Sequence, residues 1–245
     1  LFYTQEQRGN DEIVSCYYLT TGQPAWRHRD AARFYDSHAG AGPRATPTID
    51  DGRVYTLGGT GILNVLDARD GSVAWTRNAA TDTRTKAPMW GFAGSPVVIG
   101  KVVIVAAEGT LAAYDRATGT LRWSGPNGGK SYSSPHLVTI DGVTQVVHMS
   151  EAGATGFSPA DGKQLWTIAW PGEDRILQPT VTAEGDLLLG ASGIDFYMRR
   201  IAVTRAATGW KTTVRWESRG LQPNFTIFDQ DDQVRLIKKL CGADG

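Results

Sequence analysis

The 245-residue sequence predicts an all-β fold, a β-propeller of four-stranded antiparallel blades with about five blades present. Three observations predict it. A tryptophan phrase returns every 40–50 residues, a proline marker runs in phase with it, and short apolar runs separated by Gly-centred turns fill the interval between them. A period of this length, with four short strands in each unit, is typical of propeller blades.

The tryptophan phrase ends each unit. Its four strict copies read YYLTTGQPAW, VLDARDGSVAW, AAYDRATGTLRW and GFSPADGKQLW, and each places a glycine four residues before the tryptophan. A looser copy, AATGWKTTVRW, has three extra residues. The tryptophans are Trp26, Trp75, Trp123, Trp166 and Trp216, separated by 49, 48, 43 and 50 residues. We therefore count five units, of which the first is incomplete.

The proline marker opens the first apolar run of a unit, at Pro47, Pro96, Pro135, Pro179 and Pro223. In the second unit, the runs 47–50, 54–57 and 62–66 and the run that ends at Trp75 are separated by turns at Asp51-Gly52, at a Gly-rich segment and at Asp70-Gly71. Gly-centred turns between short alternating runs indicate β-hairpins. Each complete unit is thus expected to be one four-stranded sheet.

The tryptophan phrase also has a local explanation. Asp67 and Asp115 can accept backbone N–H bonds in the turn that follows them, and Gly119 can supply the positive φ of a hairpin. Four residues later the tryptophan lies on the outermost strand, where its ring can pack on the neighbouring blade and bury about 200 Å². We expect the five tryptophans to hold neighbouring blades together, and recurrence at the blade period is what such packing requires.

Composition excludes several partner classes. Twenty-five basic residues balance 25 acidic ones, so the sequence has no basic footprint for nucleic acid. No apolar run reaches the roughly 18 residues of a membrane span. Cys16 and Cys241 lack disulfide-framework or metal-ligand spacing and are expected to be unpaired thiols or core residues. The chain starts without Met or a signal peptide, which we interpret as part of a longer protein.

The phrase D-x-x-[TD]-G-x-x-x-W, in phase with [ST]-P-x-[VL], resembles the tryptophan-docking repeat of the pyrroloquinoline-quinone (PQQ)-like β-propellers, and the resemblance covers residues 1 to about 224. The family includes bacterial quinoprotein alcohol dehydrogenases, the non-enzymatic lipoprotein scaffold of the outer-membrane β-barrel assembly machine, and uncharacterised exported proteins. The segments 40–75 and 128–143 are most similar to the uncharacterised group. The resemblance implies a seven- or eight-bladed propeller in the periplasm or a secreted one.

The sequence departs from the quinoprotein dehydrogenases. It has no adjacent cysteine pair, no c-type haem signature C-x-x-C-H, and no set of Glu, Asn and Asp that we assign to calcium. We therefore predict no cofactor from the residues themselves. PQQ with calcium is implied by the resemblance alone.

Residues next to the marker prolines are the candidates for a binding site, because the turns that enter the innermost strands converge at one end of the propeller channel. They are Arg44, Thr46, Trp90, Phe92, Ser95, Tyr132, Ser134, Arg175, Gln178 and Gln222, with His136 and Asn224 directly after their prolines. This mixture of polar and aromatic residues is common in binding sites. The alternative is that they are turn residues that satisfy backbone groups. We assign no catalytic or metal-ligating residue, because neither a G-x-S-x-G elbow nor a metal-like histidine spacing is present.

Residues 225–245 do not continue the repeat. Asp229 or Asp231 could cap a short helix with Val234, Ile237 and Leu240 at helical spacing and Gly242 at its end. We divide the chain into propeller repeats at 1–224 and an atypical tail at 225–245, explained by a junction, a fusion or an altered reading frame. Five units would either close as a small ring or associate with other copies through open edges.

The preferred functional interpretation is a non-catalytic binding or scaffold module of the bacterial cell envelope, with a protein or a small molecule bound at the end of the channel. The alternative is a PQQ-dependent alcohol dehydrogenase or a degenerate relative of one. A hydrolase or lyase that uses the same residues is a third interpretation. Fold alone does not decide among them.

Overall fold

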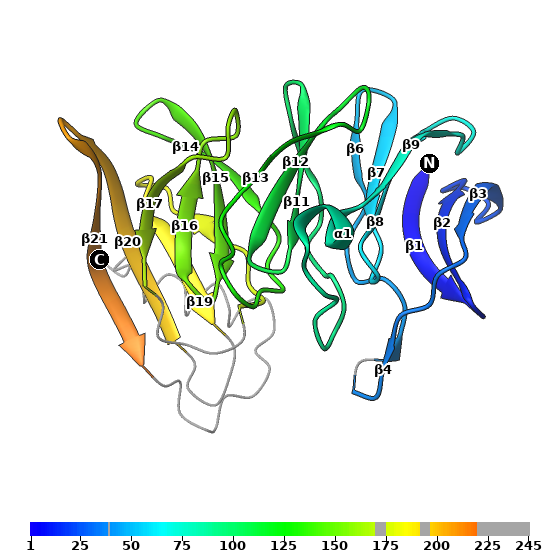
Figure 1. Cartoon of the computed structure of the whole chain (residues 1–245), viewed down its shortest axis with the longest axis horizontal. Coiled ribbons are helices and arrows are strands. Elements are labelled where there is room, and N and C mark those ends of the chain that lie inside the picture. Colours follow the sequence, from blue (N-terminus) through cyan, green and yellow to red (C-terminus); the bar gives the residue numbers. More distant parts are fainter. Residues whose placement is uncertain (39, 170–174, 192–196, 220–245) are drawn as a thin grey trace.

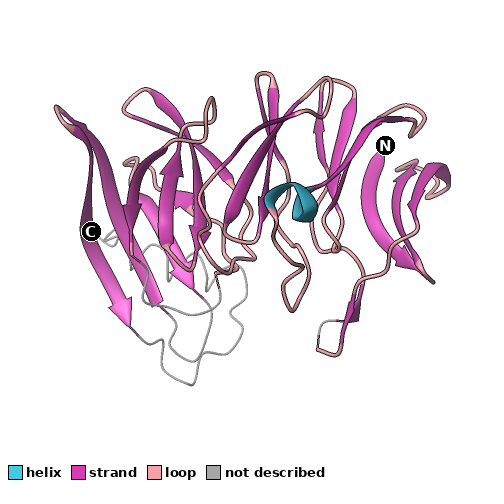
Figure 2. Ribbon diagram, viewed as in Figure 1, coloured by secondary structure: helices cyan, strands magenta, loops and turns pink. Residues whose placement is uncertain are grey.

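The computed structural model describes residues 1–38, 40–169, 175–191 and 197–219. These segments form five antiparallel sheets in chain order, together with a two-stranded hairpin and one short helix (Figures 1 and 2). The predicted all-β fold with four-stranded blades is confirmed. The tail 225–245, Cys241, Gln222 and Asn224 lie outside the described residues.

The first sheet has three strands, as the incomplete first unit predicts, and the other four sheets have four strands each. The first contains β1 (Phe2–Arg8), β2 (Asp11–Tyr17) and β3 (Pro24–Asp30). The second contains β6 (Thr48–Asp50), β7 (Arg53–Leu57), β8 (Ile62–Asp67) and β9 (Val73–Asn78). The third contains β10 (Val97–Ile99), β11 (Val102–Ala107), β12 (Thr110–Asp115) and β13 (Leu121–Ser124).

The remaining elements complete the molecule. The fourth sheet contains β14 (His136–Ile140), β15 (Val143–Ser150), β16 (Gly153–Phe157) and β17 (Gln164–Ile168). The fifth contains β18 (Thr180–Val181), β19 (Leu187–Ala191), β20 (Tyr197–Ala206) and β21 (Gly209–Arg219). β4 (Tyr35–Asp36) and β5 (Gly40–Ala41) form the hairpin, and α1 (Ala79–Thr83) follows β9. Within the described residues, no helix is long and apolar enough to cross a membrane.

Every sheet has the same internal arrangement of strands. Neighbours in sequence are neighbours in the sheet, and the short first strand of each four-stranded sheet follows a marker proline. A register shift between the last two strands recurs in all five sheets, next to the tryptophan. Such a bulge increases the local twist of the outer strand.

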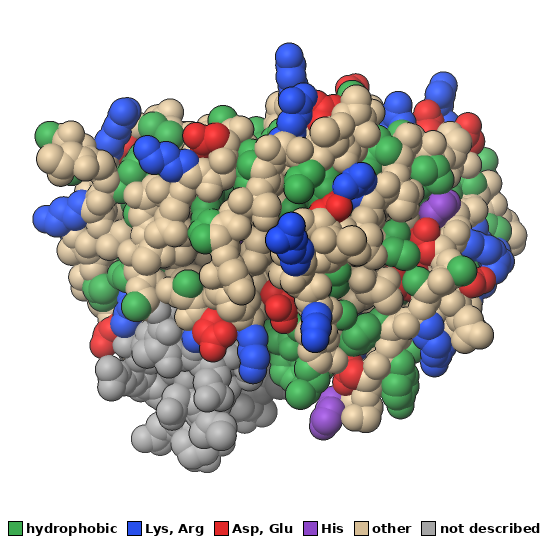
Figure 3. All heavy atoms as spheres, viewed as in Figure 1, with side chains coloured by type: hydrophobic (Ala, Val, Ile, Leu, Met, Phe, Trp, Pro, Cys, Tyr) green, Lys and Arg blue, Asp and Glu red, His purple; other side chains and the backbone are tan. Residues whose placement is uncertain are grey.

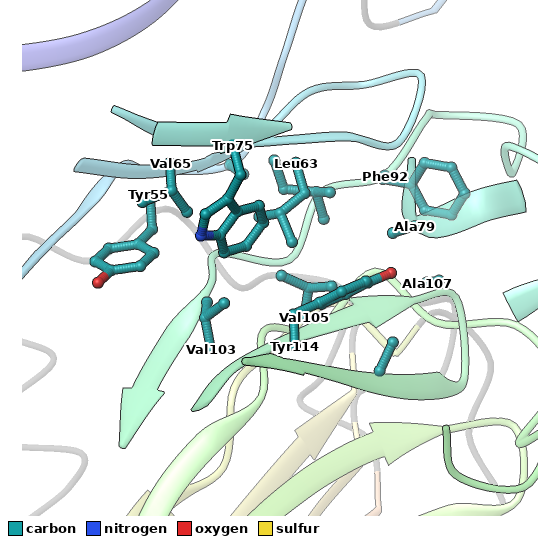
Figure 4. Close-up of a cluster of buried hydrophobic side chains, with 13 residues drawn as sticks. Tyr55, Leu63, Val65, Trp75, Ala79, Phe92, Val103, Val105, Ala107 and Tyr114 are labelled. Atoms are coloured by element: carbon teal, nitrogen blue, oxygen red, sulfur yellow. The ribbon is translucent and has the colours of Figure 1, made fainter. Parts of the chain in front are cut away.

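The hydrophobic core consists of layers between successive sheets. The layer between the second and third sheets includes Tyr55 and Trp75 from one side and Val103 and Tyr114 from the other (Figure 4). Each of the other three sheet pairs has its own cluster. Because each sheet is apolar on both faces, it needs a neighbour on each side. Figure 1 places the first and last sheets at opposite ends of the molecule, so the described sheets form an open array.

Candidate functional site

Three of the tryptophans cross to the next sheet with the same geometry. The indole Nε1 of Trp26 donates to the carbonyl of Ala68 at 3.0 Å, that of Trp75 to Arg116 at 3.0 Å, and that of Trp123 to Pro159 at 3.1 Å. Each accepting carbonyl belongs to the residue three positions before the glycine of the next tryptophan phrase.

The glycine of the phrase is required for two reasons. Gly71, Gly119 and Gly162 have φ of +73°, +73° and +71°, which L-residues rarely adopt. A Cβ at these positions would lie 2.5, 2.7 and 2.5 Å from the preceding tryptophan ring. The turn is further fixed by its acid, since Asp115 Oδ1 accepts the backbone N–H groups of Ala117 and Thr118 at 3.0 and 2.9 Å. The tryptophan of one sheet and the glycine turn of the next therefore pack together and connect the two sheets.

Trp166 departs from this geometry. Its ring is buried between the fourth and fifth sheets, but its Nε1 donates to Gln145 Oε1 of its own sheet at 2.7 Å. The reason lies in the fifth sheet, where β20 and β21 are joined by a short turn at Gly209, and a Cβ there would meet nothing within 4 Å. Trp216, in β21, is half-buried. The three extra residues of the fifth phrase were the sequence signal of this difference.

The residues that precede the marker prolines gather around adjoining cavities. One cavity of about 420 Å³ is lined by Arg44, Thr46, Trp90, Ser95, Tyr132 and Ser134, together with Ala93 and Ile176. A second, of about 370 Å³, shares Ser95 and Ser134 and includes His136 and Gln178. A third, of about 350 Å³, is lined by Trp90, Tyr132 and Arg175. We call the surface around these three cavities the proline-loop face.

Several polar members of this group join one sheet to the next. The backbone N–H of Thr46 donates to Ser95 Oγ at 2.9 Å, and the N–H of Ser95 donates to Ser134 Oγ at 2.9 Å. Gln178 Nε2 donates to the carbonyl of Pro135 at 3.0 Å. These bonds recur at the blade period, which is the behaviour of structural groups.

Arg44 is also engaged within the fold. Its guanidinium donates to the carbonyl of Gly42 at 2.6 Å and to Asp36 Oδ2 at 2.7 Å, and it lies 5.1 Å from the centre of the Phe34 ring. Phe92, which the sequence grouped with the binding candidates, lies instead in the core layer between the second and third sheets (Figure 4). Burial lowers the pKa of His136, so its imidazole is neutral at physiological pH.

An aromatic pair stands between two of the cavities. The rings of Trp90 and Tyr132 have centroids 4.8 Å apart and an interplanar angle of 34°. Met89 and Ile176 line these cavities and are 71% and 42% exposed, and Leu177, the residue after Ile176, is 50% exposed. Exposed apolar side chains gathered in one patch are typical of an interaction surface.

Sequence reasoning missed the charged wall of the third cavity. Glu108, Lys130 and Glu151 line it beside Arg175. Burial raises the pKa of Glu108, the nearby Glu151 raises it further, and Lys130 opposes both. The sequence does contain a signal for these residues. Because successive strands of a unit run in opposite directions, the turn between the second and third strands lies at the same sheet edge as the loop before the marker proline.

Charged side chains elsewhere are dispersed over the surface, and so are the side chains that could bind a metal ion. Acidic and basic side chains are interspersed on the face shown in Figure 3, consistent with the zero net charge. Among the described residues, no group of three or more His, Cys, Asp or Glu side chains is placed to hold a metal ion.

Comparison with known proteins identifies relatives. The profile of a family described as outer membrane protein assembly factor BamB matches residues 10–233. The chain is 30% identical over 151 residues to quinohemoprotein alcohol dehydrogenase ADH-IIG of Pseudomonas putida, covering 55% of this chain and 21% of that protein. It is 29% identical over 171 residues to outer membrane protein assembly factor BamB of Shewanella oneidensis, covering 65% and 38%. The chain thus spans well under half the length of these relatives.

Two solved structures share the fold. BamB from Moraxella catarrhalis superposes with a TM-score of 0.55 at 18% identity, covering 88% of this chain and 63% of that one. Quinohemoprotein alcohol dehydrogenase from Comamonas testosteroni superposes with a TM-score of 0.56 at 16% identity, covering 93% and 44%. At these identities the likeness concerns the fold alone.

Proposed function

The chain belongs to the PQQ-repeat β-propeller family described as outer membrane protein assembly factor BamB, and from this premise we propose that it is a non-catalytic binding module of the bacterial cell envelope. Its proline-loop face holds a segment of a polypeptide partner. The periplasm is the compartment that this proposal implies.

The observation that carries the proposal is the Trp90–Tyr132 pair and its surroundings. The hydroxyls of Ser95 and Ser134 are occupied by hydrogen bonds between sheets. What remains for a partner is an aromatic pair, exposed Met89 and nearby charged side chains. Aromatic residues, Met and Arg are the residue types enriched in the buried centres of protein–protein interfaces.

The experiment is site-specific photo-crosslinking in bacterial envelopes. A photoreactive side chain at position 89 should give a discrete crosslinked species, and Trp90→Ala in the same chain should remove it because truncation of a central aromatic weakens the contact. The control is the same photoreactive group at position 19, whose leucine is 75% exposed on the first sheet, away from the proline-loop face. Equal crosslinking from both positions, or none from position 89, would overturn the proposal.

A second candidate is a PQQ-binding dehydrogenase relative. The Trp90–Tyr132 pair beside Arg175 and Lys130 is an arrangement that a flat anionic ring could occupy. Calcium fits less well, because the described residues gather no three candidate ligands around one point. If PQQ binds with calcium, their addition should raise the melting temperature by mass action. No shift at concentrations well above micromolar favours the first proposal.

A further inference from the structure

Glu108 occupies an unusual backbone position. It lies in the turn between β11 and β12 with φ of +55°, a left-handed conformation that is uncommon for residues other than glycine, asparagine and aspartate. Asp51 and Asp141, the other acidic residues with positive φ in the described part of the chain, lie in exposed turns between the first and second strands of their sheets. Like Glu108 they precede a glycine, but the short aspartate side chain can hydrogen-bond locally and so favours this conformation. Glutamate has no such local advantage, and residues held in sparsely populated conformations cluster at functional sites.

The neighbouring sheet fixes this position. The Glu108 carbonyl lies 3.1 Å from Nε2 of His148, a fully buried residue of β15. Burial lowers the pKa of His148 to about 4, so the ring is neutral at physiological pH and can donate through Nε2. The next residue, Gly109, exchanges backbone hydrogen bonds with Gly129 and Gly128 at 2.8 and 3.2 Å. The Glu108 side chain is thus presented from a rigid support.

The Glu108 carboxylate is half-buried in the third cavity of the proline-loop face, of about 350 Å³. Within the described residues it accepts no hydrogen bond, and its charge is opposed by Glu151 and assisted only by Lys130. Desolvating a carboxylate without donors is unfavourable. A bound cation would restore the lost stabilisation.

The other walls of the cavity suit an organic cation. Trp90 and Tyr132 offer ring faces, and Met89 offers a polarisable thioether. Arg175 lies at the same cavity, and its Nε is buried without an acceptor among the described residues. An arginine in that state can donate to a peptide carbonyl of a ligand that enters alongside it.

We propose that this cavity binds the basic side chain, arginine or lysine, of an extended polypeptide segment. Glu108 and Glu151 pair with the guanidinium or ammonium group, the aromatic pair lies against it, and Arg175 donates to the segment's backbone. This inference rests on the proposed function, since it names the chemistry of the polypeptide that the proline-loop face receives.

The charged groups around the site define its pH dependence. Glu108 must be ionised to pair with the cation, Glu151 adds a second negative charge, Lys130 favours the ionised carboxylate of Glu108, and Arg175 is a further cation that lines the cavity. Burial raises the pKa of Glu108, so acidification protonates it at a higher pH than an exposed glutamate and removes the attraction. Binding of a basic peptide should therefore weaken as the pH falls.

The test uses two blocked tripeptides, acetyl-Gly-Arg-Gly-amide and acetyl-Gly-Glu-Gly-amide, titrated into the whole chain by calorimetry. The arginine peptide should bind and the glutamate peptide should not. Glu108→Gly should weaken binding at least about tenfold, the loss expected for one charged contact of about 1.4 kcal/mol. Because glycine adopts positive φ without strain, the same variant should melt at an unchanged or higher temperature.

Asp51→Gly is the matched control. It also removes an acid from a left-handed position, with φ of +46°, but it lies between β6 and β7 of the second sheet, at the edge opposite the proline-loop face, and it should leave binding unchanged. Equal binding of both peptides, unchanged binding by Glu108→Gly, or a clearly lower melting temperature for that variant would overturn the inference. Crosslinking from position 89 distinguishes this inference from the proposed function. A crosslink without peptide binding refutes this inference alone. Peptide binding without a crosslink refutes the proposed function.

Discussion

Replacing the glycine of a tryptophan phrase by alanine separates backbone strain from contact between sheets, because the chain supplies both cases. Gly71 has φ of +73°, and a Cβ there would lie 2.5 Å from the Trp26 ring. Gly22 has φ of +68° in the same kind of turn, and a Cβ there would meet nothing within 4 Å. Their backbone N–H groups make equivalent bonds, to Asp67 at 2.9 Å and to Tyr18 at 2.8 Å.

The free energies lost in the two substitutions should therefore differ only by the contact between sheets that Gly71 permits. An L-residue in the left-handed conformation costs roughly 1–2 kcal/mol, and this is the whole effect expected for Gly22→Ala. Gly71→Ala carries the same strain. It adds overpacking of about 1–3 kcal/mol and loss of the indole hydrogen bond from Trp26, about 1 kcal/mol. We expect about 3–6 kcal/mol for Gly71→Ala.

Urea unfolding followed by tryptophan fluorescence measures both variants against the parent chain. Gly71→Ala should also change the emission of Trp26 before unfolding begins, since its ring must move. Equal destabilisation by the two variants would refute the reasoning, because it would mean that the glycine is needed only for its backbone conformation.

Three further predictions use the same measurement. Trp75→Phe keeps most of the buried ring but removes the donor to the Arg116 carbonyl, and should cost about 1 kcal/mol more than its loss of apolar area explains. Ser134→Ala leaves the N–H of Ser95 without its acceptor and should cost about 1–2 kcal/mol while the sheets stay intact by circular dichroism. Burial raises the pKa of Glu12 to about 7, so the native state holds a proton that the unfolded state releases near pH 4.5. The contribution of this proton to the free energy of unfolding is therefore complete below pH 4.5 and is lost as the pH rises to about 7. Glu12→Gln should remove this loss, and parallel pH profiles for the two proteins would contradict the assignment.

The repeat made the fold predictable because the same physical requirement occurs once per sheet. The Asp51-Gly52 turn, the run that became β7 and the position of Trp75 on the outer strand all follow from local chemistry repeated in phase. The short helix α1 and the β4–β5 hairpin were not predicted, since each occurs once and carries no periodic signal.

The candidate site was only partly predictable for the opposite reason. Proximity to the marker proline grouped Trp90 with Tyr132, and both line one cavity; that they bind a ligand stays a prediction. It could not distinguish Phe92, two residues away from Trp90, whose side chain enters the core. Nor did it include Glu108, because Glu108 lies in the turn between the second and third strands of its unit and is far in sequence from the marker prolines.

In a repeat protein, a residue that departs from the repeat is a better sign of function than one that recurs in every unit. Ser95 and Ser134 occupy equivalent positions and make equivalent bonds, so their recurrence is explained by the joint between sheets. Glu108 and Glu151 each follow directly on the second strand of their sheets, where the second sheet has the Gly-rich turn 58–61, but of the two glutamates only Glu108 has a left-handed backbone. A glutamate in a left-handed turn is more strained than glycine, so packing alone does not favour it. If Glu108→Gly folds better and binds worse, the side chain is retained for binding at the expense of stability, and the same criterion can be applied to each non-repeating residue of the proline-loop face.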